Sequence, residues 1–454
     1  MGARLARAVG WLRSALVFGL MLGSATAAAA PLHEGPAPLE LTAGDPADPL
    51  HFGLGASVWL RGEARAESGP VGWQIPQRTR VQVEARWRGL RSFVQVQDVR
   101  AWGTADTITT AATTGIHQGY FELSGRRGRA EGSIRVGRQQ HFLGSMRLVG
   151  LAPWNPNMRA FDAVRLSGTH GPFSVDVVGA LLRRPQTLTV TDASGDAREL
   201  RHGGEGWLAT AVRVQAHRAF DLEGYALLRN YAPTEAEPER ERVVFSPGAR
   251  AQGELGRGFR YDLEGYVQTG RWDGLSHAAW LGAATVGYRF DDPHVPLVEG
   301  GYLATSGSGC AEVSGDVTCD VDGHRDFDGL LGARHRFMGI ADLFAPTNTH
   351  DAWAGLRVSP AGWTELRVEM HHFMLHDPTG RWLRVNEAAV GIGPDPAGTR
   401  RTVGEELDLR VNLHPWGPLT AQLGYAMFVP VAAGERHVGS SVLHFAYLMT
   451  QVAF

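Results

Sequence analysis

The sequence lacks lysine and contains only two cysteines, Cys310 and Cys319. Its 44 basic residues are therefore all arginine, and they nearly balance 47 acidic residues, which leaves a formal net charge of −3. A balanced charge of this kind is not the basic footprint that nucleic-acid binding needs, so we expect no nucleic-acid partner.

Long apolar runs are also absent after the first thirty residues. No later segment offers the 18 or more consecutive apolar residues of a membrane-spanning helix, and helix-like periodicity is scarce. Glycine (58 residues), phenylalanine (18) and tryptophan (13) are plentiful instead. A strand-rich, glycine-rich and cysteine-poor chain favours an all-β protein, a transmembrane antiparallel β-barrel of the outer-membrane type.

The N-terminal thirty residues have the layout of a secretory signal peptide. Arg4, Arg7 and Arg13 precede a short apolar stretch, and small residues follow it up to Ala30. An N-terminal membrane anchor is the alternative, but the apolar stretch is short and ends in a cleavage-like site. We predict a signal peptide over residues 1–30, a flexible periplasmic tail over 31–50 and the barrel over 51–454.

The stretch QRTRVQVEARWRG, residues 77–89, shows how the strands are built. Arg78, Arg80 and Glu84 alternate with Val81 and Val83, which is the period of two expected of a strand. We expect the apolar face to look outward to lipid and the charged face to look into an aqueous lumen.

Eighteen segments of this kind are separated by turn residues, and short connections alternate with long polar loops. Short turns on one side and long loops on the other are typical of an outer-membrane barrel with both termini in the periplasm. The last segment ends in Phe454, a pattern typical of the signal that outer-membrane assembly machinery reads. The predicted strands are 53–65, 75–87, 91–102, 116–124, 131–139, 161–168, 173–183, 206–217, 219–230, 247–256, 258–269, 279–290, 295–304, 351–359, 362–374, 402–413, 418–429 and 441–454.

Several short motifs recur in order along these segments. The sequence resembles the alginate export family, outer-membrane porins that secrete alginate and their relatives. The matching elements are Gln97-Asp98-x-Arg100-x-Trp102, Gly137-Arg138-Gln139, Arg147-Leu148 with a following Trp154, Arg159-x-Phe161-Asp162, and His335-x-Phe337-x-Gly339-x-x-Asp342.

The resemblance implies an eighteen-stranded, monomeric barrel with an Arg-lined constriction, through which an acidic polysaccharide such as alginate or a related polyuronate diffuses passively. Matching positions carry the pore-lining role to Arg100, Arg138, Arg147, Arg159 and Asp162. Periodicity alone adds Arg80 and Arg135. The alternative for each is a structural role, as a hydrogen-bonded wedge that folds a loop into the barrel.

Two features of the longest loop invite weaker hypotheses. Cys310 and Cys319 are expected to form a disulfide in an oxidising compartment. Asp320 and Asp322 begin a calcium-like pattern, but the full twelve-residue loop signature is absent, so a solvated acidic loop is favoured. His371 and His372 point to opposite faces of a strand and cannot share an ion. We therefore expect no cofactor and no metal.

Two other function classes remain open alternatives. An uptake porin for small sugars or carboxylates would have the same wall, and a passive pore carries no direction. A lipase-type outer-membrane enzyme would need a paired Ser and His, which the sequence does not offer, so we expect no enzyme. The predicted channel is weakly anion-selective and lies in the outer membrane of a Gram-negative bacterium. Its expected partners are lipid and lipopolysaccharide, the anionic polysaccharide, periplasmic export proteins and the assembly machinery.

Overall fold

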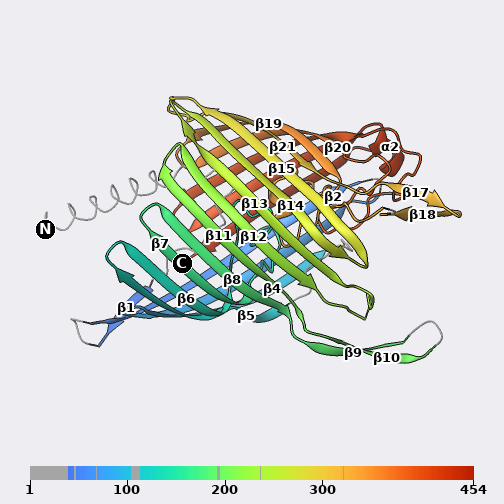
Figure 1. Cartoon of the computed structure of the whole chain (residues 1–454). Coiled ribbons are helices and arrows are strands. Elements are labelled where there is room, and N and C mark those ends of the chain that lie inside the picture. Colours follow the sequence, from blue (N-terminus) through green and yellow to red (C-terminus); the bar gives the residue numbers. More distant parts are fainter. Residues whose placement is uncertain are drawn as a thin grey trace.

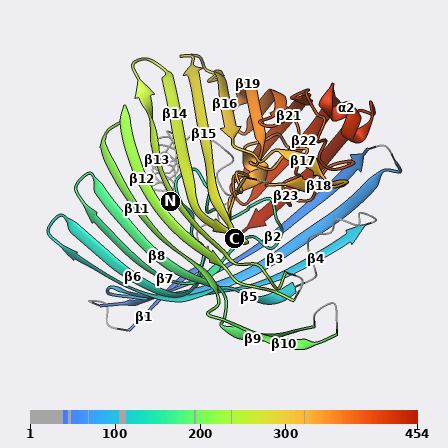
Figure 2. The same cartoon turned by 45° about the vertical axis from the view of Figure 1, so that its right-hand side comes forward.

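The computed structural model describes residues 39–44, 48–67, 69–103, 113–191, 195–235, 237–320 and 322–454. The predicted signal peptide lies outside these residues. Eighteen long antiparallel strands form one closed barrel, shown from two directions in Figures 1 and 2. The wall strands are β2 (Leu50–Ala66), β3 (Gly72–Trp87), β4 (Leu90–Gly103), β5 (Thr113–Arg127), β6 (Ala130–Gln139), β7 (Phe161–His170), β8 (Phe173–Arg183), β11 (Glu205–His217), β12 (Phe220–Tyr231), β13 (Arg242–Leu255), β14 (Phe259–Trp272), β15 (Leu275–Arg289), β16 (Leu297–Thr305), β19 (Thr349–Ala361), β20 (Thr364–Leu375), β21 (Thr402–Trp416), β22 (Leu419–Pro430) and β23 (Leu443–Ala453).

Each of the eighteen predicted segments corresponds to one wall strand. The wall closes because β23 pairs with β2, with Ser57 opposite Ala453 and Ala66 opposite His444. Closure leaves no unpaired strand edge toward hydrocarbon, which is what allows a sheet to cross a membrane. Among the residues described, no helix is long and apolar enough to span a membrane.

The two faces of the wall follow the predicted alternation. On β3, Val81 and Val83 are 48% and 49% exposed on the outer face, whereas Arg78 and Arg80 on the inner face are each only 4% exposed. The outer face is therefore apolar and the inner face charged, as the period of two predicts.

Five shorter strands lie outside the eighteen. β1 (Leu39–Ala43) pairs with β2, so part of the segment predicted as a tail forms a strand at the short-turn end of the barrel. β9 (Gln186–Thr191) with β10 (Ala197–His202), and β17 (Cys310–Val313) with β18 (Asp316–Cys319), form two hairpins. Both hairpins project at the opposite end, on the right in Figure 1.

Three long loops fold back into the barrel. We call residues 140–160 the first inner loop, residues 306–348 the second and residues 376–401 the third. Leu148 and Phe344 are fully buried although they belong to loops. The Phe344 ring stacks at 3.8 Å on Phe373 of β20, an inward-facing wall residue. Part of the lumen that the sequence predicts to be open is thus filled by a packed apolar core.

Candidate channel constriction

The first two inner loops are joined into one partition. The amide of Leu331 donates to the carbonyl of Leu148 at 2.9 Å, and the amide of Gly150 donates back to Leu331 at 3.0 Å. The contact needs glycine, because a Cβ added at Gly332 would lie 2.1 Å from the carbonyl oxygen of Arg147. Two loops more than 150 residues apart in sequence therefore act as one structural unit.

Backbone carbonyls attach the first inner loop to one side of the wall. Arg61 of β2 donates to the carbonyl of Trp154 at 2.7 Å, and Gln97 of β4 donates to that of Asn157 at 3.1 Å. On another side, Nε of Arg147 donates to Glu264 of β14 at 3.0 Å. The loop thus bridges strands that are distant in the wall.

The segment from His335 to Asp342 attaches the second inner loop to the first. His335 Nδ1 lies 2.6 Å from Asp342 Oδ1, which closes the ends of the motif on each other. The His335 ring stacks at 3.7 Å on Trp154, and the guanidinium of Arg61 covers another face of Trp154 at 3.5 Å. The guanidinium of Arg147 lies 4.0 Å from the Phe337 ring. The motif that carries the family resemblance therefore builds the partition.

Four arginines lie on these inner loops, and their partners differ. Arg147 pairs with Glu264, and Arg334 pairs with Glu387 of the third inner loop. The other two have no carboxylate partner in the part of the chain that the structure describes. Arg159 donates to the carbonyl of Gly332 at 3.0 Å, and Arg336 reaches the sulfur of Met146 at 3.6 Å.

Positive charge is crowded around these two side chains. Burial, followed by the guanidinium groups of Arg147 and Arg250, lowers the pKa of Arg336 to about 10. Burial, followed by Arg334 and Arg229, lowers the pKa of Arg159 to about 10. Both side chains stay protonated at neutral pH, so the partition carries cations that no acidic side chain neutralises.

The wall, by contrast, holds its arginines in ion pairs between neighbouring strands. Arg250 of β13 binds Asp262 of β14 at 2.6 Å, and Arg357 of β19 binds Glu299 of β16 at 3.0 Å. The predicted residue Arg135 faces inward in the same way and pairs with Glu122 of β5. The predicted Arg80 also faces inward, and its Nε donates to Gln97 at 2.8 Å.

Three predicted pore-lining residues lie on the outer face instead. Arg100 pairs with Asp98 at 2.7 Å and shares its side of β4 with the exposed Val94 and Val96. The prediction is wrong at Arg100 because a motif match fixes a position in the chain but not the face of the strand.

Arg138 and Asp162 form an exposed pair at 3.3 Å on the outer face. The sequence held the signal that separates them from the lumen. Arg135 and Arg138 are three residues apart, and a strand cannot turn both inward. Only Arg147 and Arg159 of the motif-derived set lie at the partition.

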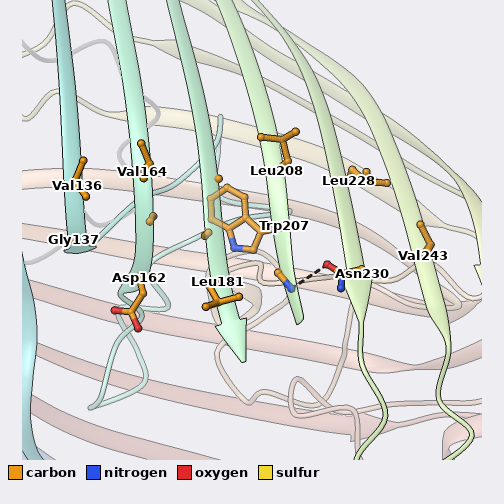
Figure 3. Close-up of a pocket in the computed structure, with 14 residues that line it drawn as sticks. Val136, Gly137, Asp162, Val164, Leu181, Trp207, Leu208, Leu228, Asn230 and Val243 are labelled. Carbon is orange, nitrogen blue, oxygen red and sulfur yellow. Dashed lines mark hydrogen bonds between the residues drawn. The ribbon is translucent and has the colours of Figure 1, made fainter. Parts of the chain in front are cut away.

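A shallow apolar hollow lies beside this outer pair (Figure 3). Val136, Val164, Leu181 and Leu208 line it, and Asp162 lies near one end. Because these valines and leucines belong to the exposed outer face, the hollow faces lipid and does not form part of a path through the barrel.

The predicted cysteine pair and acidic loop lie at the long-loop end. Cys310 and Cys319 are joined by a disulfide across β17 and β18. Asp320 approaches His324 and Asp326 closely enough to share an ion, and Asp322 is not in this group. Arg381 of the third inner loop already binds Asp320 at 2.8 Å, so its guanidinium supplies the positive charge there.

Comparisons with known proteins agree with this architecture. The family model described as "Alginate export" matches residues 54–445. No curated protein is similar enough to count as a match. Two solved structures share the fold. Pseudomonas aeruginosa OccK3 (OpdO) has a TM-score of 0.53 and 13% identity, with 88% of this chain and 95% of that chain covered. Acinetobacter baumannii OccAB2 has a TM-score of 0.56 and 9% identity, with 89% and 98% covered.

Proposed function

Because the chain belongs to the alginate export family, we propose that it is a passive channel that exports an anionic polysaccharide, alginate or a related polyuronate. The family and the closed barrel support the broader statement that the protein is an outer-membrane channel. The observation that carries the finer proposal is the pair Arg159 and Arg336, which lie on the partition without a carboxylate partner among the described residues.

A polyuronate presents one carboxylate per sugar, and arginine suits that repeat. Its planar guanidinium binds a carboxylate through two parallel hydrogen bonds. Transport also requires contacts that are weak and repeated, since a single tight site would hold the polymer. Arg147 and Arg334, each already shared with an acid, and Arg159 and Arg336, each with spare donors, form such a graded set.

An uptake porin for small sugars or carboxylates is the second candidate. The observation that favours it is the packed partition, because three inner loops occupy part of the lumen and narrow the path. Family and fold are those of channels, and we propose no enzymatic activity. A monomeric state, contact with lipopolysaccharide and periplasmic export partners remain parts of this proposal.

The test is ion selectivity and block in planar lipid bilayers, with residues 31–454 refolded and reconstituted. Oligo-uronates and neutral oligosaccharides of matched length are added separately. We expect an anion preference and block by oligo-uronates alone. Block only by neutral sugars, or a cation preference, would contradict the polyuronate proposal and leave the uptake porin.

A further inference from the structure

Two carboxylates of β21 hold the centre of the second inner loop. Glu406 and Asp408 are 0% and 1% exposed on the inner face of the wall. The amide of Ala341 donates to Oε1 of Glu406 at 2.9 Å, and the amide of Ile340 donates to Oδ2 of Asp408 at 3.0 Å. Gly339 permits this approach, since a Cβ there would lie 2.4 Å from Glu406 Oε1.

Too little positive charge faces this pair for both groups to be ionised. From β20, His371 lies with its Nε2 3.8 Å from Asp408, but its Nδ1 is already bound to Asp351 of β19 at 3.0 Å. The other charged groups nearby are paired among themselves. They are Glu369 with Arg367 and Arg410, and, on the loop, Asp342 with His335.

The hydrogen bonds of the two carboxyl groups are incomplete in a specific way. Within the part of the chain that the structure describes, no N–H or O–H donor reaches Oε2 of Glu406 or Oδ1 of Asp408. A side-chain hydrogen bond joins the two groups. A carboxylate only accepts, so a bond between two carboxyl groups requires that one of them carries a proton. Two adjacent buried carboxylates cannot both ionise without a large electrostatic cost.

We infer that Glu406 and Asp408 share one proton and form a latch that holds the second inner loop against the wall, so that attachment of the loop depends on pH. This latch would regulate the width of the path and in that sense rests on the proposed function. With one proton, the pair carries a single negative charge, which the two loop amides and His371 stabilise. Loss of that proton at high pH places two like charges side by side away from water and releases the loop.

A bound divalent cation is the competing explanation for such a cluster. Donor atoms of Glu369, His371 and Asp408 lie within 4.8 Å of one another. Both oxygens of Glu369, however, contact the guanidinium groups of Arg367 and Arg410. An ion at that point would lie beside two cations, so the shared proton accounts for the cluster better.

Hydrogen–deuterium exchange at Ile340 and Ala341 tests the latch without requiring any conduction. Residues 31–454 are reconstituted in lipid nanodiscs, and amide protection factors are measured between about pH 5 and about pH 10. In the unmodified protein we expect protection at both amides to fall by about tenfold or more as pH rises through the loss of the shared proton. Asp408→Asn should keep its protection across the whole range, because the amide cannot ionise but can still donate to Glu406.

Two variants complete the design. Glu406→Gln repeats the test from the other partner in case Asp408→Asn does not fold. Glu405→Gln is the matched control, because Glu405 is the preceding residue, faces outward and pairs with His372. It should reproduce the pH profile of the unmodified protein.

The outcomes separate the hypotheses. Equal, pH-independent protection in the unmodified protein and in Asp408→Asn would overturn the latch. Loss of protection on adding EDTA, with recovery on adding zinc, would assign the cluster to a metal ion and overturn it as well. A pH-dependent profile in a protein that shows no anion preference in bilayers would retain the latch and remove the proposed function.

Discussion

Arginines of the wall and arginines of the inner loops perform different tasks, although one residue type serves both. On the wall, Arg250 and Arg357 neutralise acids of neighbouring strands. On the inner loops, Arg159 and Arg336 contact a backbone carbonyl and a sulfur atom instead. The comparison teaches that the number of inward arginines does not set the field in the channel. Only arginines without an acidic partner contribute net charge where a polymer would pass.

Breaking a wall pair should give the largest effect, and on stability. Arg250→Gln leaves Asp262 and Glu223 without their buried cation, and removal of one partner of a buried pair costs about 3 kcal/mol or more. We expect lower stability, measured by urea unfolding in lipid vesicles. The double variant Arg250→Gln/Asp262→Asn is the control and should recover most of the loss. Equal stability of the two variants would contradict a pairing role for the wall arginines.

Detaching the second inner loop should change conductance more than stability. Gly339→Val places a side chain against Glu406 at a residue whose φ is +70°, and such overpacking costs about 1–3 kcal/mol. We expect a larger single-channel conductance, because the partition loses its attachment. Gly417→Val, in a turn with open space around the site, is the matched control. An unchanged conductance in Gly339→Val would show that the loop does not narrow the path.

Removing the unpaired loop arginines should alter selectivity while leaving the barrel intact. For Arg159→Gln/Arg336→Gln we expect the anion-to-cation permeability ratio to fall by about three- to tenfold, since pore-lining cations favour anions. Reversal potentials in salt gradients measure this ratio. The charge-matched control is Arg250→Gln/Asp262→Asn, which removes a cation together with its partner and should leave the ratio unchanged. The same shift in both variants would erase the distinction between wall and loop.

The outer-face arginines should give the smallest effect. Arg100→Gln and Arg138→Gln break exposed pairs, each worth less than about 1 kcal/mol. We expect unfolding free energy and ion selectivity to stay within experimental error of the unmodified protein, by urea unfolding and reversal potential. A changed selectivity would mean that these side chains reach the path after all, contrary to their place beside outward-facing valines.

The strand pattern was largely readable from the sequence, and the site only in part. All eighteen wall strands were predicted, because lipid on one side and water on the other impose a period of two on each. Strand parity alone would have placed Arg138 outside, opposite to Arg135. For Arg159 the alternative reading, a wedge that folds a loop into the barrel, describes its bond to Gly332. Arg334 and Arg336 were missed because no periodicity marks a loop residue as inward-facing.

The sequence by itself determined the wall of this protein, whereas the tertiary structure alone decided what fills it. Wall strands obey a local rule, in which neighbouring residues see lipid or lumen in turn, so the chain encodes them within a few residues. The partition depends on contacts such as Arg159 with Gly332 and Ala341 with Glu406, which join segments 173 and 65 residues apart. No local pattern specifies such partners. They are selected only when the closed barrel brings its loops and its inner wall together.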